Sequence, residues 1–414
     1  MKSSGKKRIL VVCQHFWPEE FKINDICRSW VEMGYEVDVL CGIPNYPKGK
    51  YFQGYSIFKK RHEEYHGVNV HRAFLIPRGS GNPVQVFLNY ITYPIFSIYH
   101  ILKLARNNYD KVLVYQLTPI FMAYPALLLK KLKKVKVYMY ILDLWPESLY
   151  SVYNFNSRLY KAIFDCISHN IYKKCDYFLT TSRGIKEKIH RLYNVDRDKI
   201  LYLPNWAEKL YEERRVNEEL REKYKGTFNI MFAGNIGPAQ SFDTILNAAK
   251  MCYDQGYKDI KWIIVGDGMT KKWVDDRIKE LGIESVVDMV GRKPMSSMPE
   301  YYDVADVLLV SLVKSELFSI TVPAKITSYL AAGKPIIASL DGEGGDIIKE
   351  SGAGFACEAE DEAKLAKLVK RMYLLSDSER KIMGDKGYLY YLDNFSKEKL
   401  LVKLTKFVFE ENKI

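Results

Sequence analysis

The sequence lacks the paired cysteines that define disulfide frameworks and structural zinc sites. Its seven cysteines are scattered singly over 414 residues, and no two of them form a C-x-x-C pair. Such an unpaired, odd set is typical of a protein kept in a reducing compartment. The histidines also lack metal-ligand spacing, and the one D-x-D, Asp196–Asp198, falls in a predicted surface turn. We therefore expect no metal ion in this protein.

The sequence also lacks a hydrophobic run suited to spanning a membrane. The first apolar run, Ile9–Cys13, follows basic residues but is too short for a signal-peptide core. The uncharged run Val84–Leu102 contains too many polar residues for a spanning helix. A second uncharged run, Val112–Leu129, is broken by two prolines and leads into the lysines of Lys130–Lys134. Both runs are typical of helices at a membrane surface, with ordinary sheet-covering helices as the alternative.

Negative charge is scarce in the first half of the chain. Residues 1–200 carry a net charge of +15 and residues 201–414 one of −3, which together make the +12 of the whole chain. This asymmetry indicates that only the first half meets an anionic partner. Because no zinc finger, RNP motif or basic region with heptads is present, an anionic membrane surface fits better than nucleic acid.

Short apolar or β-branched runs alternate with helical stretches along the chain. This alternation indicates parallel sheets covered by helices on both faces, so we predict an α/β protein of two doubly wound, Rossmann-like domains. The helices with the clearest signals are Ile23–Met33, Ser241–Ala249, Pro323–Ala332 and Lys397–Glu411. The predicted strands are Ile9–Cys13, Glu36–Cys41, Val68–Phe74, Lys111–Tyr115, Val135–Tyr140, Phe178–Thr181, Ile200–Leu203, Asn229–Ala233, Ile260–Val265, Val286–Met289, Val307–Val310 and Pro335–Ala338.

The boundary between the two domains is expected at Leu203–Trp206, where a strand ends in a proline turn. Residues 1–204 then form a basic N-terminal domain, and residues 205–395 form a C-terminal domain. The last segment, residues 396–414, is predicted to contain an amphipathic helix. We expect this helix either to dock back on the N-terminal domain or to cap the C-terminal one.

Three loops that follow predicted strands of the N-terminal domain share an unusual composition. They are Gln14–Phe21, Gly42–Gly49 and Asp143–Ser148, and they are rich in Trp, Tyr, Pro, Asn and carboxylates. Open parallel sheets place ligands at the carboxyl ends of their strands, so these loops are expected to meet at one edge. Aromatic faces cover the C–H side of a sugar ring, and carboxylates accept hydrogen bonds from its hydroxyls. The loops therefore predict a carbohydrate site.

Two glycine-rich turns follow strands of the C-terminal domain, at Gly234–Gly237 and Gly266–Gly268. Glycines let a backbone approach a phosphate at a helix N-terminus. The second turn does not complete G-x-G-x-x-G because Lys271 stands where the third glycine would be, and no such motif follows the first strand either. A nicotinamide-dependent dehydrogenase is therefore a disfavoured alternative.

Lys325 lies near the start of a predicted helix. Pro323 fits the first helical position, with Thr321 or Val322 as the cap. A lysine in the first turn opposes the helix dipole. Because an anion between the lysine and the helix amides would remove this conflict, Lys325 is a candidate ligand of a diphosphate.

Six motifs in this order resemble glycosyltransferase family 4, whose members have the GT-B architecture. The resemblance covers nearly the whole chain and is nearest to the WbuB-like, fucosamine-type transferases of O-antigen and capsule synthesis. It implies two Rossmann-like domains facing a central cleft, with the acceptor in the N-terminal domain and the nucleotide sugar in the C-terminal one. The motifs are QHFWPEEF (Gln14–Phe21) with Asn24 and Asp25, CGIPNYPK (Cys41–Lys48), DLWPES (Asp143–Ser148), LPNW (Leu203–Trp206), GNIGPAQ (Gly234–Gln240) and VPAKITSYLAAGKP (Val322–Pro335).

The resemblance implies a retaining, metal-independent transfer of a sugar, expected to be an N-acetylated amino sugar, from a UDP-sugar. No cofactor is expected. The expected partners are the nucleotide sugar, a polyprenyl-diphosphate-linked sugar acceptor and an anionic membrane surface, without nucleic acid. Such an enzyme is expected in the cytoplasm, as a peripheral protein on the inner face of the cell membrane. A sugar-nucleotide epimerase on the same scaffold is the alternative.

The wider family carries Arg and Lys near the positions of Asn235 and Gln240, so neutralisation of the diphosphate is expected to fall to Lys325 and Arg183. The family also has a pair of glutamates at fixed spacing. Glu316 matches the first by its SELFSI context and keeps a predicted catalytic role near the donor sugar, whereas the second falls at Ser328. The predicted donor-binding residues are Gly234, Asn235, Gly237, Gln240, Gly266, Gly268, Arg292, Thr321, Lys325 and Arg183.

Asp143 is the predicted catalytic carboxylate. It is expected either to accept the proton of the acceptor hydroxyl or to stabilise positive charge at the anomeric carbon. Retention is expected to proceed by front-face attack, in which the leaving phosphate helps to deprotonate the acceptor. The predicted acceptor-binding residues are Pro18, Glu19, Glu20, Asn45, Tyr46, Trp145 and Glu147.

Overall fold

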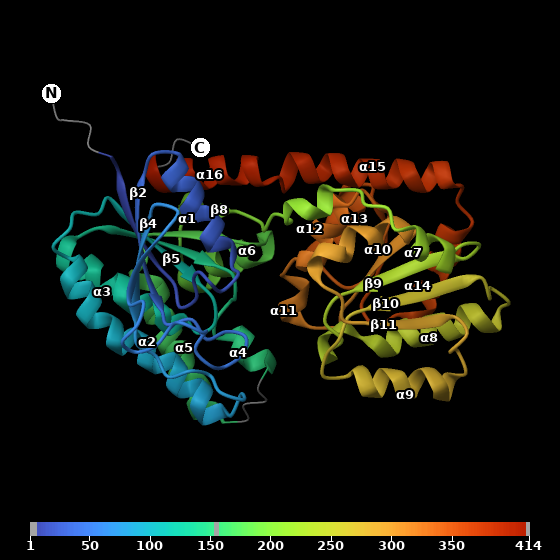
Figure 1. Ribbon diagram of the computed structural model, residues 1–414, viewed down its shortest axis with the longest axis horizontal. Coiled ribbons are helices and arrows are strands. Elements are labelled where there is room, and N and C mark those ends of the chain that lie inside the picture. The colour runs from blue at the N-terminus through green and yellow to red at the C-terminus, as the bar shows by residue number, and fades with distance from the viewer. Residues whose placement is uncertain (1–5, 153–156, 411–414) are drawn as a thin grey trace. The chain divides into compact units, whose positions relative to one another are not determined.

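The computed structural model describes residues 6–152 and 157–410, which fold into two α/β units. Of these residues, the first unit contains 6–181, 185–203 and the chain from 401, and the second contains 182–184 and 204–400. Each unit is a twisted sheet with helices packed against it (Figure 1). The predicted α/β class is confirmed, with one parallel sheet and one that is parallel except at its edge strand β3 (His62–Tyr65).

The first sheet has the strand order β3-β4-β2-β1-β5-β6-β7-β8. Neighbouring strands are parallel except for β3, which is antiparallel to β4 at the edge. Central strands such as β1 (RILVV) are mainly apolar, here from Ile9 onward, because helices cover both faces of the sheet. The strands are β1 (Arg8–Val12), β2 (Glu36–Gly42), β3 (His62–Tyr65), β4 (Val68–Ala73), β5 (Lys111–Gln116), β6 (Lys136–Ile141), β7 (Tyr177–Thr180) and β8 (Ile200–Tyr202).

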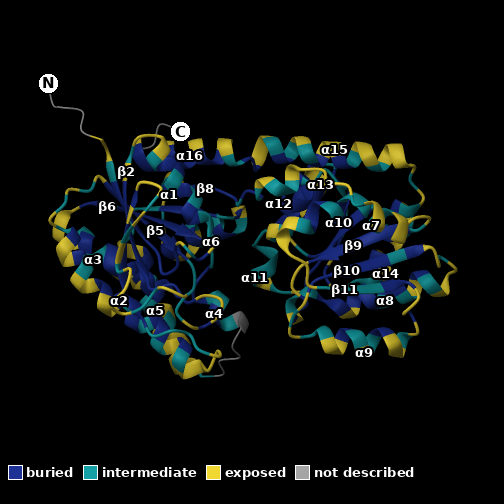
Figure 2. Cartoon of the chain, viewed as in Figure 1, coloured by how far each residue is buried: buried dark blue, intermediate teal, exposed yellow. Residues whose placement is uncertain are grey.

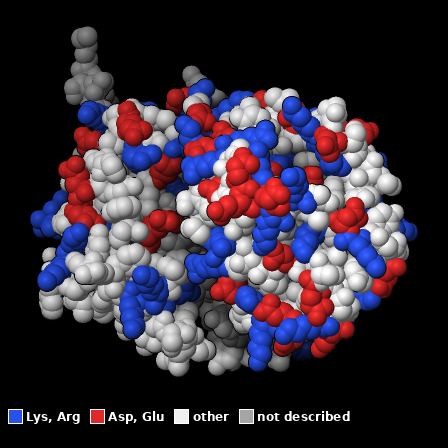
Figure 3. All heavy atoms as spheres, turned by 45° about the vertical axis from the view of Figure 1, so that its right-hand side comes forward, with Lys and Arg blue, Asp and Glu red and all other residues white. Residues whose placement is uncertain are grey.

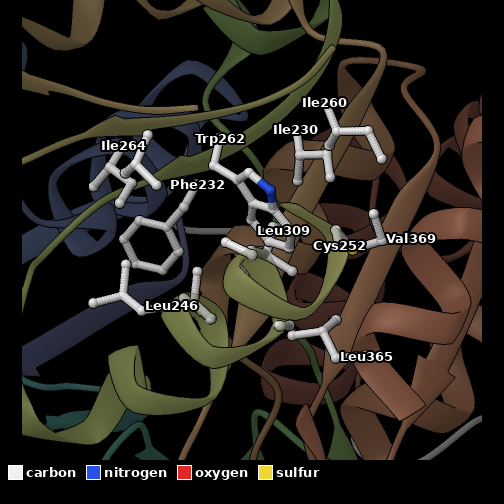
Figure 4. Close-up of a cluster of buried hydrophobic side chains, with 14 of the residues drawn as sticks. Ile230, Phe232, Leu246, Cys252, Ile260, Trp262, Ile264, Leu309, Leu365 and Val369 are labelled. Carbon is white, nitrogen blue, oxygen red and sulfur yellow. The ribbon is translucent and has the colours of Figure 1, made fainter. Parts of the chain in front are cut away.

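The second sheet is parallel, with the order β11-β10-β9-β12-β13-β14. One of its two described hydrophobic clusters lies where α8 (Phe242–Asp254) and α14 (Glu362–Tyr373) cover β9, β10 and β12. Figure 4 shows Trp262, Phe232 and Leu309 from the strands against Leu246 and Leu365 from the helices. The strands are β9 (Phe228–Ala233), β10 (Ile260–Val265), β11 (Val287–Gly291), β12 (Val307–Ser311), β13 (Ile336–Ser339) and β14 (Gly354–Cys357).

The helices agree with the predicted alternation in both units. The described helices of the first unit are α1 (Lys22–Glu32), α2 (Pro83–Leu104), α3 (Tyr124–Lys133), α4 (Glu147–Val152), α5 (Arg158–Lys174) and α6 (Arg183–Tyr193), with the 3-10 turns η1 (Ile120–Ala123) and η2 (Arg197–Lys199). Those of the second unit are α7 (Glu218–Lys223), α8 (Phe242–Asp254), α9 (Lys271–Leu281), α10 (Met298–Val304), α11 (Glu316–Ser319), α12 (Ala324–Ala331), α13 (Glu343–Glu350), α14 (Glu362–Tyr373) and α15 (Asp377–Asn394), with the 3-10 turns η3 (Lys209–Glu212), η4 (Pro238–Gln240) and η5 (Met295–Ser297).

The sequence pattern did not predict two of the strands. β3 has the sequence HEEY, which is charged because an edge strand exposes one side of its backbone and most of its side chains. β14 has the sequence GFAC and is too short, and too poor in β-branched residues, to stand out. The first sheet is therefore mixed, since the β3–β4 hairpin adds an antiparallel strand at its edge.

The C-terminal helix α16 (Lys397–Phe409) packs from Leu401 onward on the first unit. The indole Nε1 of Trp30 in α1 donates to Thr405 Oγ1 at 2.9 Å, and both side chains are buried. Tyr35 stacks on Phe409, with ring centroids 4.0 Å apart. These contacts correspond to the first of the two expectations, in which the helix docks back on the N-terminal domain.

Helix α2 is apolar on its exposed face as well as on its buried one, and several polar side chains are among its buried residues. Asn89, Thr92 and Ser97 are buried, whereas Ile95 is 56% exposed and Tyr99 is 69% exposed. Figure 2 shows exposed segments along α2. Thr92 and Asn89 bond to the backbone of Ile76, which explains why polar residues occur in an otherwise apolar run. In the described part of the chain, no helix is both long and apolar enough to cross a bilayer.

The contact between Trp30 and Thr405 generates a stability prediction. Thr405→Val keeps the side-chain shape but leaves the buried indole N–H without its acceptor, which costs about 1–3 kcal/mol. We expect a fall of that size in the free energy of unfolding, measured by chemical denaturation. Val402→Thr is the matched control, because Val402 is 47% exposed on the same helix. Equal effects of the two substitutions would contradict the docking role assigned to Thr405.

Candidate functional site

In the first unit, the predicted sugar-binding loops follow strands that are neighbours in the sheet. β2, β1, β5 and β6 are adjacent and parallel, so their carboxyl ends lie at the same edge. The loops after β1 and β2 contact each other directly, as do the loops after β5 and β6. A cis X-Pro bond occurs in each of these four loops, at residues 17–18, 46–47, 118–119 and 145–146.

Glu19 joins the first two loops. Its Oε1 accepts hydrogen bonds from the backbone N–H groups of Asn45 at 2.7 Å and Tyr46 at 2.6 Å. Its Oε2 lies 3.0 Å from Nδ1 of His15, whose ring stacks on Phe21. The carboxylate is only 2% exposed. Glu19 therefore fixes the shape of this edge from inside.

A chain of buried amides continues this network. Nε2 of Gln14 donates to Oδ1 of Asn89 at 2.7 Å, which links the loop after β1 to α2. Oδ1 of Asn45 accepts from the backbone N–H of Arg78 at 3.3 Å. The guanidinium of Arg78 donates to the hydroxyl of Tyr90 at 2.6 Å and lies over the ring of Tyr46. Arg78 thus places a cation beside the predicted acceptor loops.

The structure divides the predicted acceptor residues into two groups. Glu19, Asn45 and Trp145 are at most 2% exposed and position the loops, and their direct contact with an acceptor stays a prediction. Pro18, Glu20, Tyr46 and Glu147 are at least partly exposed at the same edge. Tyr46 is 40% exposed and offers a ring face.

Asp143 lies directly beyond β6 and is held by the loop after β5. Its Oδ2 accepts from both the backbone N–H and the Oγ1 hydroxyl of Thr118, each at 3.1 Å. Burial raises the pKa of the Asp143 carboxyl, although the two Thr118 bonds act in the opposite direction. A half-buried carboxyl with a raised pKa, at the ligand edge of the sheet, suits a proton acceptor.

Glu147 and Trp145 anchor the loop that carries Asp143. Oε1 of Glu147 forms an ion pair with Nζ of Lys188 in α6 at 3.1 Å. The indole of Trp145 packs edge-to-face on Phe121 of η1, with ring centroids 5.4 Å apart. These contacts connect the Asp143 loop to helices on the outside of the sheet.

In the second unit, the two predicted glycine turns pack backbone to backbone. The N–H of Gly234 donates to Val265 O, and the N–H of Ile236 donates to Asp267 O, both at 2.9 Å. A Cβ on Gly266 would lie 1.8 Å from the carbonyl oxygen of Gly234, and one on Gly268 would lie 2.2 Å from that of Ile236. Only glycine therefore fits at either position.

Lys325 projects from the first turn of α12 into this loop. Its Nζ donates to Oε1 of Gln240 at 2.8 Å and lies 3.5 Å from the ring centroid of Phe232. Gly234 makes room for it, because a Cβ there would lie 2.5 Å from Lys325 Cε. Burial lowers the pKa of the Lys325 amine to about 7. A bound anion would therefore stabilise the charged form of this amine.

Helix α12 begins one residue later than predicted. Pro323 is the N-cap, with φ −58° and ψ 133°, and neither it nor its neighbours caps the helix through a side chain. The predictions that Pro323 is the first helical residue and that Thr321 or Val322 is the cap are therefore wrong. The extended ψ of Pro323 turns the chain before the helix starts, which leaves Lys325 in the first turn as expected.

The remaining predicted donor residues have other neighbours. The guanidinium of Arg183 is paired with Glu350 at 3.2 Å, and its backbone N–H donates to Glu343. Arg292 is exposed directly after β11, whose last residue, Gly291, accepts from the N–H of Gly266. Glu316 is the first residue of the short helix α11, and Thr321 lies two residues beyond its end. Asn235 is exposed in the Gly234 turn.

Acidic and basic side chains are interspersed over the face of the second unit that Figure 3 presents. This mixture agrees with the near-neutral charge of the second half of the sequence. Local positive potential for a diphosphate must therefore come from individual groups such as Lys325 and from backbone amides. Over residues 6–152 and 157–410, no cluster of His, Cys, Asp or Glu has an arrangement that could hold a metal ion.

Sequence reasoning missed three functional neighbours. Thr118, which holds Asp143, follows β5, so the rule of inspecting every strand end would have found it. Phe232 is the last but one residue of β9 and gave no signal, because an apolar residue is expected there. Arg78 lies in the loop between β4 and α2, and only its contacts with Asn45 and Tyr90 place it at the site.

Two stretches of the chain match known sequence families. Residues 23–208 match Glycosyltransferase Family 4, and residues 213–390 match Glycosyl transferases group 1. The chain is 27% identical over 242 residues to the probable glycosyltransferase WbjE of Pseudomonas aeruginosa, which covers 55% of this chain and 57% of that protein. It is 22% identical over 344 residues to the putative colanic acid biosynthesis glycosyl transferase WcaI of Escherichia coli, covering 79% and 81%. The match to WbjE thus spans little more than half of that relative.

Solved structures resemble the whole chain. A glycosyltransferase from Rickettsia africae ESF-5 superposes with a TM-score of 0.69 at 17% identity, covering 98% of this chain and 100% of that one. HepE of Anabaena, in complex with UDP, has a TM-score of 0.70 at 12% identity, covering 97% and 99%. At these identities the likeness shows the fold, and it confirms the predicted GT-B architecture. Because the relatives are various glycosyltransferases, the WbuB-like subtype stays a prediction.

The close packing of the two glycine turns makes a stability prediction. Gly266→Ala places a methyl group against the carbonyl oxygen of Gly234, and backbone cannot yield as a flexible side chain can. We expect a loss of about 1–3 kcal/mol in the free energy of unfolding of the second unit, measured by denaturant titration. Gly345→Ala in α13 is the control, since its methyl group would make only ordinary contacts. A tolerated Gly266→Ala would mean that the two turns are not packed this way.

Proposed function

The chain carries a Glycosyltransferase Family 4 domain followed by a group 1 glycosyltransferase domain on a GT-B fold, and from this premise we propose that it transfers a sugar from a UDP-sugar to a polyprenyl-diphosphate-linked acceptor. The transferred sugar is an N-acetylated amino sugar, as in the WbuB-like branch that the motifs resemble. The product is a cell-surface polysaccharide of the O-antigen or capsule kind. The names of the relatives, which include colanic acid and amylovoran biosynthesis enzymes, support that role.

The observation that carries the proposal is the position of the Lys325 amine. The wider family has a basic residue near position 240, and this chain has Gln240 there. The amine of Lys325 reaches the same place from α12 and bonds to that glutamine. The cation expected in the donor loop is thus supplied by a helix, which supports a diphosphate at the Gly234–Gln240 turn. The UDP bound to HepE supports UDP as the nucleotide.

The proposed reaction needs no metal and no cofactor. Protonated Lys325 and the amides of the glycine turns stabilise the charge that develops on the leaving diphosphate. The acceptor hydroxyl attacks the anomeric carbon on the face that the leaving group vacates, so the configuration is retained. The leaving phosphate accepts the hydroxyl proton, while Glu316 lies near the donor sugar.

Asp143 acts in the acceptor half of the reaction. Its position at the carboxyl edge of the first sheet, and the raised pKa that burial gives it, support a role beside the reacting hydroxyl. Thr118 orients the carboxylate through two hydrogen bonds. Tyr46 covers the apolar side of the acceptor sugar, and Glu20 accepts hydrogen bonds from its hydroxyls.

The enzyme works in the cytoplasm, as a peripheral protein on the inner face of the cell membrane. The apolar exposed face of α2 supports this proposal, because such a face is costly in water and favourable in a bilayer interface. Lysines gather at the ends of α3 and α5, where they suit anionic headgroups. The net positive charge of the first half of the chain also favours binding to anionic headgroups.

Binding of UDP tests the role of Lys325, and it carries a pH signature. In the unliganded protein the amine has a pKa near 7, so it is mostly neutral at pH 8. A bound diphosphate favours the charged form and raises that pKa, so binding takes up a proton and affinity falls as pH rises above 7. We expect calorimetry at pH 8, in buffers of different ionisation heat, to show an uptake approaching one proton.

Lys325→Ala should weaken UDP binding by about 1.5–3 kcal/mol, the range for a hydrogen bond to a charged group, and abolish the proton uptake. Lys325→Arg should bind without the pH dependence, since guanidinium stays charged. Lys349→Ala, an exposed lysine of α13, should bind UDP like the wild type. Undiminished affinity in Lys325→Ala would remove the lysine from the donor site.

Chelation tests the metal-free mechanism. We expect turnover of the UDP-sugar to be unchanged by excess EDTA and not to rise on addition of Mg²⁺ or Mn²⁺, because amides and Lys325 already stabilise the leaving group. The measurement is UDP release with and without chelator, with a metal-dependent transferase in parallel as the control. Activity that disappears with EDTA and returns with Mg²⁺ would overturn the mechanism.

A further inference from the structure

Helices α2, α3 and α5 enclose an apolar groove on the first unit. It has a volume of about 490 Å³ and contains no charged side chain among the nine residues that line it. Its rim is exposed: Ile95 is 56%, Ile98 46% and Tyr124 39% accessible to solvent. The three helices lie on the same side of the first unit (Figure 1). The lining consists of Ile91, Pro94, Ile95, Ile98, Phe121, Tyr124, Pro125, Leu128 and Ile167.

One end of the groove lies beside the candidate acceptor site. Phe121 lines the groove and also packs on Trp145, two residues from Asp143. Ile91 lines the groove, and the preceding residue, Tyr90, holds the guanidinium of Arg78. No carboxylate pairs with Arg78 within the described residues. Arg78 is thus bonded to the turn of α2 that carries Ile91, which places a cation near this end of the groove.

Lysines lie near the other end of the groove. Tyr124 and Leu128 are shared with a second hollow of about 670 Å³, lined also by Lys130, Lys131, Lys134 and Lys174. These lysines lie at the C-terminal ends of α3 and α5. α3 has ten residues and is thus about 15 Å long, so its lysines are remote from the edge that carries Asp143. A diphosphate at these lysines could not present its sugar to Asp143.

From this arrangement we propose that the groove between α2, α3 and α5 binds the hydrocarbon chain of the lipid-linked acceptor, with the diphosphate at Arg78. The inference rests on the proposed function, because it assumes a prenyl diphosphate acceptor. An uncharged lining suits hydrocarbon, and the cation at the site end suits the diphosphate next to it. The lysines at the far end then face the anionic headgroups of the bilayer from which the chain emerges.

The groove differs from a general membrane contact, and this difference can be tested. Ile98 lines the groove, whereas Leu102, one turn further along α2, is 54% exposed and does not. Simple insertion of α2 into a bilayer would use both residues alike. Chain binding uses Ile98 only, so Ile98→Gln and Leu102→Gln form a matched pair.

The experiment measures binding of geranyl and geranylgeranyl diphosphate to the full chain in the absence of membranes. We expect the longer probe to bind at least about tenfold more tightly to the wild type, because it buries more apolar surface. Ile98→Gln should remove most of that gain and Leu102→Gln should retain it. Arg78→Gln should weaken both probes by a similar factor. Thermal unfolding verifies that each variant is folded.

Three results would overturn the proposal: equal affinity for the two probes, equal losses in Ile98→Gln and Leu102→Gln, or full displacement of the longer probe by phosphatidylglycerol. Light scattering that shows a dimer held by these helices would overturn it too. The probes contain no sugar and undergo no transfer, so the test is independent of UDP binding at Lys325. Loss of UDP affinity would thus leave the groove result intact, and the reverse is also true.

Discussion

A partly desolvated cation is the constraint on which the proposed donor site of this protein depends. The Lys325 amine lies over the Phe232 ring and against Gln240, in a space that exists because residue 234 has no side chain. Burial alone makes this charge unfavourable, as the lowered pKa indicates. An anionic ligand pairs with the charged amine, and this pairing contributes to the free energy of binding. The glycine turns, the start of α12 and the end of β9 all serve this one arrangement.

The proposed acceptor site separates side chains that hold its loops from side chains that can meet a ligand. One carboxylate oxygen of Glu19 accepts from the backbone of the neighbouring loop and the other contacts His15, so Glu19 stabilises the structure of these loops. Asp143, by contrast, is bound through one oxygen to a single residue, Thr118. Carboxylates in similar sequence surroundings therefore have different chemistry, because their neighbours differ. The two aromatic residues differ in the same way: Trp145 packs inside the loops, whereas Tyr46 presents a ring face at the surface.

Helix α2 connects the acceptor site to the proposed lipid surface. Its buried amide and hydroxyl groups hold the loops after β1 and β4, and its outer face is apolar. The same helix thus positions the site on one side and lines the groove on the other. A substitution on α2 can affect either property, depending on which face carries it.

Local pattern determined much of this protein. Strand and helix periodicity indicated the α/β class, the alternation of strands with helices, and twelve of the strands to within a residue or two. The reason is that strands buried between two layers of helices consist mainly of apolar residues. It also indicated Asp143, the glycine turns and Lys325. Only the tertiary structure decided that Lys325 meets Gln240, 85 positions away in the chain, that Phe232 lies beneath the amine and that Arg78 reaches the acceptor loops. It also decided that α2 faces outward with its apolar side. Such neighbours depend on strand order and helix packing, and no local pattern records which residues those bring together.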